Sequence, residues 1–136
     1  MADPDAAMMA GPDKIARFIE TRRLTSLSGA FADSDVTIIE NFAPHVFSGP
    51  DAVARWTGSM RGHLDGVTDL HHTFGPPRDF GRTGDLAFFS LPTRWTGVDH
   101  GKRFTEQGGW VFVLVRQGAR WPVRNYAWAV VSASYD

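Results

Sequence analysis

The sequence predicts an α+β fold in which a cone-shaped, curved antiparallel sheet (a partial barrel) packs on three N-terminal helices. Three observations support this prediction. Apolar residues recur at helical spacing in the first half of the chain, long runs of strand-forming residues fill the second half, and two adjacent glycines interrupt one of those runs. Helices that precede a group of long strands are typical of a sheet covered on one face.

Helical spacing begins at Asp13, where Ile15, Phe18 and Ile19 follow one another at intervals of three and four residues. The same pattern continues after residue 23, which predicts two short helices or one bent helix; the residues that continue it are Leu24, Leu27 and Phe31. A β-branched run at 36–39 then predicts a strand that ends near Glu40.

A third helix is predicted after the segment Ser48-Gly-Pro-Asp51. This segment offers a capping hydroxyl, a proline suited to a first helical turn and an acid three residues after the serine. The helix ends at Gly66, and its apolar face is formed by Val53, Trp56, Met60 and Leu64.

The rest of the chain is predicted to form strands. A strand at 68–74 is followed by long strands at 86–96, 103–116 and 121–132, with a hairpin loop at 97–101. Gly108-Gly109 lies within the second long strand and indicates a bulge or bend. The sheet is therefore expected to curl.

Composition limits the possible functions. The 136 residues fit one domain, for which we predict a flexible tail at 1–12 and a single unit at 13–136. A formal charge of -1 disfavours nucleic acid, and no apolar run is long enough to cross a membrane. The absence of cysteine excludes disulfides and is compatible with the cytoplasm, which is where we expect the protein.

Two segments carry a family resemblance, Phe31-Ala-Asp-Ser-Asp-Val-Thr-Ile-Ile-Glu-Asn-Phe42 and Phe47-Ser-Gly-Pro-Asp-Ala-Val-Ala-Arg-Trp56. With the closing strand Trp121-Pro-Val-Arg-Asn-Tyr-Ala-Trp128, they resemble the nuclear transport factor 2-like superfamily, in its SnoaL-like and ketosteroid isomerase-like branch. The resemblance covers residues 13–133. It implies a cone with an internal pocket, and a homodimer formed through the outer face of the sheet.

The resemblance also implies a catalytic role for Glu40, which matches the position of the general base in ketosteroid isomerases. Apolar walls would raise the pKa of such a carboxyl group and suit it to proton abstraction. A strand-end glutamate exposed to solvent is the alternative. Phe18 matches the position of the family's oxyanion-stabilising tyrosine and has no hydroxyl, which argues against steroid isomerisation as the reaction.

His71 and His72 are adjacent on a strand, so their side chains point to opposite faces and cannot share one metal ion. We expect one of them to face the cavity as an acid/base partner, and His71 is the candidate. The alternative is that both histidines lie at the surface. His45, His63 and His100 are expected at the surface.

Glu106 and Arg94 lie on either side of the hairpin loop. Whether they face each other depends on the register of the two strands, which is uncertain by one residue. We expect Arg94 to point outward and leave Glu106 open as a ligand-binding residue. The expected cavity walls are aromatic, with Asn125 as a polar group: Phe18, Trp56, Trp110, Phe112 and Trp128.

The sequence therefore indicates a domain that binds an apolar small molecule, without metal or cofactor. If it is an enzyme, the expected reaction is proton transfer on an apolar carbonyl compound, in an isomerisation, dehydration or cyclisation. The alternative is a non-catalytic binding or dimerisation module that keeps the fold without the chemistry.

Overall fold

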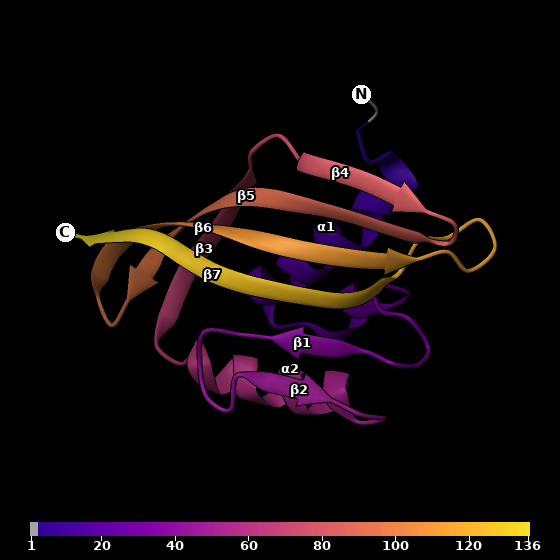
Figure 1. Cartoon of the computed structure of the whole chain (residues 1–136). Coiled ribbons are helices and arrows are strands. Elements are labelled where there is room, and N and C mark those ends of the chain that lie inside the picture. The colour runs from indigo at the N-terminus through magenta and orange to yellow at the C-terminus, as the bar shows by residue number, and fades with distance from the viewer. Residues whose placement is uncertain (1–2) are drawn as a thin grey trace.

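The computed structural model describes residues 3–136, which form two α-helices, one 3-10 helix and seven strands. Figure 1 shows the helices behind the sheet, as an α+β fold requires. No helix in this range is long and apolar enough to span a membrane. The elements are α1 (Ala6–Thr21), the 3-10 helix η1 (Leu24–Leu27), β1 (Thr37–Ile39), β2 (Val46–Ser48), α2 (Ala52–His63), β3 (Val67–Phe74), β4 (Arg78–Thr83), β5 (Leu86–Asp99), β6 (Lys102–Val115) and β7 (Val123–Tyr135).

The strands form one sheet in the order β2-β1-β7-β6-β5-β3. β3 pairs with residues 93–99 of β5, and β4 pairs with residues 86–90 of the same strand. The three long antiparallel strands are those expected. The sheet is mixed, however, because β1 runs parallel to β7, with Ile38 opposite Tyr126 and Ile39 opposite Ala127. This parallel pair brings Glu40, the residue after β1, next to the final strand.

The first helix begins earlier than expected. Asp5 caps it by accepting a hydrogen bond from the backbone N–H of Met8 at 2.9 Å, and Met8 and Gly11 are buried. A Cβ atom at Gly11 would lie 2.8 Å from Cγ2 of Val123, so the helix packs closely on β7. The prediction of a flexible tail at 1–12 is therefore wrong for residues 6–12, while residues 1 and 2 lie outside the part of the chain that the structure describes. Pro12 lies inside the helix. Because proline usually marks a helix end, the sequence did not indicate the turns that precede it.

The predicted bend lies at Gly108. The register between β6 and β7 shifts between Gln107 and Gly108. A Cβ atom at Gly108 would lie 2.5 Å from the carbonyl oxygen of Ala129 and 2.5 Å from the Trp128 ring. Only glycine permits this approach, which lets the sheet curl over the helices and leaves room beneath its inner face.

Candidate functional site

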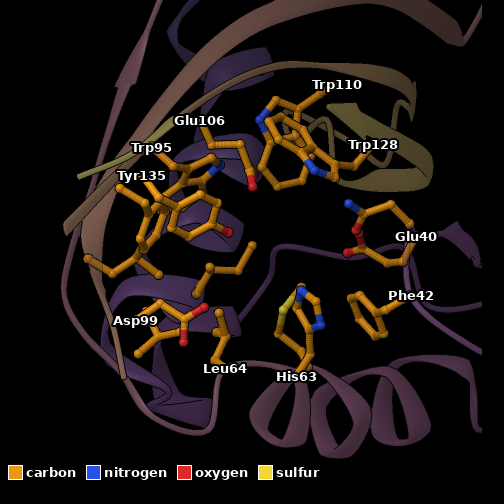
Figure 2. Close-up of a pocket in the computed structure, with 16 residues that line it drawn as sticks. Glu40, Phe42, His63, Leu64, Trp95, Asp99, Glu106, Trp110, Trp128 and Tyr135 are labelled. Carbon is orange, nitrogen blue, oxygen red and sulfur yellow. The ribbon is translucent and has the colours of Figure 1, made fainter. Parts of the chain in front are cut away.

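A cavity of about 310 Å³ lies between the inner face of the sheet and α2 (Figure 2). Its volume is at the lower end of the range of small-molecule sites. Most of the lining residues are apolar or aromatic, while polar atoms form about half of the exposed wall. The lining residues are Ile19, Glu40, Asn41, Phe42, Met60, His63, Leu64, Val67, Leu70, Trp95, Asp99, Phe104, Glu106, Trp110, Trp128 and Tyr135.

Glu40 is the most buried acid of the cavity wall, with a relative exposure of 4%. Its Oε2 atom accepts two hydrogen bonds, one from the indole N–H of Trp56 at 2.9 Å and one from the hydroxyl of Tyr126. Figure 2 shows the carboxyl group pointing into the cavity. The two donors fix one oxygen of the carboxyl group, and Oε1 accepts no hydrogen bond from residues 3–136.

Three separate elements build this arrangement. Glu40 follows β1, Trp56 lies in α2, and Tyr126 lies on β7 opposite Ile38. The ring of Trp56 also meets the ring of Tyr126 edge to face, with centroids 5.9 Å apart. Packing of the two aromatic rings thus holds both donors in place.

Burial raises the pKa of Glu40 from 4.5 to about 7. The hydrogen bonds from Tyr126 and Trp56 act in the opposite direction, because they stabilise the carboxylate, while the negative charge of Glu106 raises the pKa further. A carboxyl group with this pKa can both accept and release a proton near neutral pH, as general acid–base chemistry requires.

Glu106 approaches the same cavity from β6 (Figure 2). It stands opposite Trp95, whereas Arg94 stands opposite Gln107 and is exposed, so the two charged residues do not face each other. Burial raises the pKa of Glu106 as well. The register thus places one acid inside and the arginine outside.

The predicted aromatic walls divide into two groups. Trp110 and Trp128 line the cavity, and their ring centroids are 5.0 Å apart. Trp56, Phe18 and Phe112 lie in the buried core outside the lining. Of these, Trp56 reaches the site through its N–H, Phe18 packs against Trp56 and Phe112 stacks on Trp110.

Two predicted polar residues lie outside the lining. The side-chain oxygen of Asn125 accepts a hydrogen bond from Nε of Arg124 at 3.0 Å. His71 is exposed and lies 3.0 Å from Asp69. The expectation that His71 faces the cavity is therefore wrong, since the register of β3 shifts between Thr68 and His71. Within residues 3–136, no three side chains of the types that ligate metals are grouped to hold an ion.

Several residues of the site were not expected from the sequence. His63 is exposed, as expected, but it also lines the cavity with its ring stacked on Phe42 at 4.3 Å, and partial burial lowers its pKa. Tyr126 lies two residues before Trp128 on a strand, so the alternation of side chains could have placed both on the inner face. Asp99 and Tyr135 also line the cavity.

No protein-family model and no curated protein matches this sequence. Solved structures do match its fold. The hexachlorocyclohexane dehydrochlorinase LinA-type3 from Novosphingobium barchaimii LL02 has a TM-score of 0.80 at 11% identity, with 96% of this chain and 88% of that chain covered. Kfla4162 from Kribbella flavida has a TM-score of 0.77 at 14% identity, with coverage of 95% and 91%. A ketosteroid isomerase-like protein from Erwinia carotovora atroseptica has a TM-score of 0.71 at 15% identity, with coverage of 93% and 95%.

Proposed function

We propose, from the nuclear transport factor 2-like fold that this chain has, that its cavity binds an apolar small molecule and that Glu40 takes a proton from a carbon atom of that molecule. The related structures include a dehydrochlorinase and ketosteroid isomerase-like proteins, so the fold supports small-molecule chemistry. A shared fold does not select the reaction, and the proposal depends on the site.

The observation that carries the proposal is the state of Glu40. It is buried, its pKa is raised to about 7, and its side chain points into a cavity large enough for a ligand. Trp56 and Tyr126 hold Oε2, which leaves Oε1 as the proton acceptor. A base fixed in this way loses little freedom when it meets its substrate.

The reaction class is proton transfer on a carbonyl compound. The carbon–hydrogen bond breaks, its proton goes to Glu40, and its electron pair moves to the carbonyl oxygen as an enolate. Glu40 then returns the proton to another atom, as in an isomerisation, dehydration or cyclisation.

The test is deuterium exchange at the carbon next to the carbonyl of apolar ketones, followed by NMR. The wild type is expected to accelerate exchange, and Glu40→Gln is expected to abolish the acceleration while the circular dichroism spectrum stays unchanged. Glu20→Gln is the matched control, because Glu20 bonds His72 outside the cavity lining. Equal exchange by the wild type and Glu40→Gln would remove Glu40 from the mechanism.

A non-catalytic binding module is the second candidate. Phe18 favours it, because this residue is fully buried against Trp56 and offers no hydroxyl to an enolate. In that case an apolar ligand would quench the fluorescence of Trp110 and Trp128, and no ketone would exchange faster than in buffer.

The outer face of the sheet supports a homodimer. Leu86 and Phe88 on β5 stand opposite Val115 and Val113 on β6, so one face carries a row of apolar side chains. Leu86, Phe88 and Val111 are 37%, 38% and 39% exposed. A second copy of the chain packed on this face would cover them.

A further inference from the structure

The cavity contains acidic side chains without a basic counterpart. Glu40, Asp99 and Glu106 line it, and of the residues described by the structure no lysine or arginine does. His63 is also in the lining, but burial lowers its pKa and favours the neutral ring. The site is therefore electrically unbalanced whenever its carboxyl groups are ionised.

The excess of negative charge affects the pKa of Glu40. The charge of Glu106 raises the pKa of Glu40, so the two carboxylates repel each other across the cavity. In the described part of the chain, neither of them has a basic side chain within ion-pair distance. A positive charge placed between them would remove the repulsion and replace the solvation that burial takes away.

The walls suit a cation that is also apolar. Trp95, Trp110 and Trp128 line the cavity, and the faces of indole rings attract cations. Glu40 adds an independent observation: this residue is 4% exposed, its side chain points into the cavity, and its Oε1 atom accepts no hydrogen bond from residues 3–136. Such an oxygen is complementary to a positively charged group on a ligand.

We propose that the cavity binds an organic cation, an amine with an apolar aryl or alicyclic body, and that it rejects carboxylates and phosphates. The proposal rests on the proposed function, because it assigns a charge class to the ligand of the same cavity. Anionic compounds would meet Glu40, Asp99 and Glu106 with no cation to receive them.

The test uses three probes of similar size whose charge does not change with pH near neutrality. Benzyltrimethylammonium carries a fixed positive charge, neopentylbenzene is its neutral isostere, and phenylacetate is an anion. Quenching of tryptophan fluorescence at pH 8 measures binding to the wild type. The cation is expected to bind at least tenfold more tightly than neopentylbenzene, and phenylacetate is expected not to saturate.

Two variants show whether the preference comes from the cavity. Glu106→Gln removes one inward charge and is expected to reduce the preference for the cation several-fold. Asp85→Asn removes an exposed acid that lies 3.8 Å from Arg116, and it is expected to leave the preference unchanged. The proposal is overturned if phenylacetate or neopentylbenzene binds as tightly as the cation, or if Glu106→Gln keeps the full preference.

These results are separate from the test of the proposed function, since none of the probes is a substrate for carbonyl exchange. Loss of exchange in Glu40→Gln together with no preference for the cation would retain proton transfer and reject the charge class. A preference for the cation without any exchange would retain the charge class and favour the binding module.

Discussion

The hydroxyl of Tyr126 donates a hydrogen bond to Glu40, which lies 86 residues earlier in the chain. This contact joins the last strand of the sheet to the end of the first one, and it is made inside the protein, where both side chains are buried. Burial and the neighbouring carboxylate raise the pKa of Tyr126 well above 10, so the phenol keeps its proton and acts as a donor.

Removal of this donor is expected to make Glu40 a weaker acid. In Tyr126→Phe the carboxylate loses a hydrogen bond, so its pKa should rise further, by about one unit if the bond stabilises the charge by about 1.5 kcal/mol. The pH dependence of exchange would shift to more alkaline pH by the same amount. A profile identical to that of the wild type would show that the contact does not tune the base.

Removal of the second acid is expected to act in the opposite direction. Glu106→Gln abolishes the negative charge that raises the pKa of Glu40, so the pKa of Glu40 should fall. The exchange rate would then begin to rise at lower pH than in the wild type. An unchanged midpoint would contradict a direct interaction between the two carboxyl groups.

Stability should depend on pH through Glu40. The folded state holds its proton up to about pH 7, whereas the unfolded chain releases it near pH 4.5. The contribution of Glu40 to the free energy of unfolding is therefore fully present below pH 4.5 and is lost as the pH rises through 7, by about 3 kcal/mol. Urea denaturation across this range would measure it.

Glu40→Gln provides the comparison, because an amide does not titrate in this range. The unfolding free energy of the wild type minus that of this variant should decrease between pH 4.5 and about pH 7 and then level off. Parallel curves for the two proteins would mean that Glu40 titrates normally in the folded state.

The dimer proposal predicts that one charge on the outer face separates the subunits. Phe88→Lys places an ammonium group among the exposed apolar side chains of β5 and β6, and sedimentation should change from dimer to monomer at micromolar concentration. Leu24→Lys is the matched control, because Leu24 is 51% exposed on η1, away from the sheet. A monomeric wild type would refute the proposal.

The sequence predicted the long strands and the bend at Gly108 because their causes are local. Alternating β-branched and aromatic residues define a strand, and a glycine pair inside one marks a bulge. The cavity position of Glu40 came from the family resemblance, and the structure places this side chain in the cavity wall.

The partners of Glu40 could not be predicted in the same way. Tyr126 lies next to Glu40 because β1 pairs in parallel with β7. The spacing of apolar residues within a segment does not show which distant segment it pairs with. His71 illustrates the same limit, since the register shift in β3 decides where its side chain points. The choice between Arg94 and Glu106 likewise depended on one residue of register in the hairpin.

The most direct measurement is the titration of the Glu40 carboxyl group by carbon-13 NMR. Selective labelling of glutamate is practical because Glu20, Glu40 and Glu106 are the glutamates of the sequence, and the spectrum of Glu40→Gln assigns the signal. We expect a midpoint near pH 7, as a buried base in a ligand cavity requires. A midpoint near the ordinary 4.5 would place this carboxyl group in contact with water and contradict the proposed mechanism.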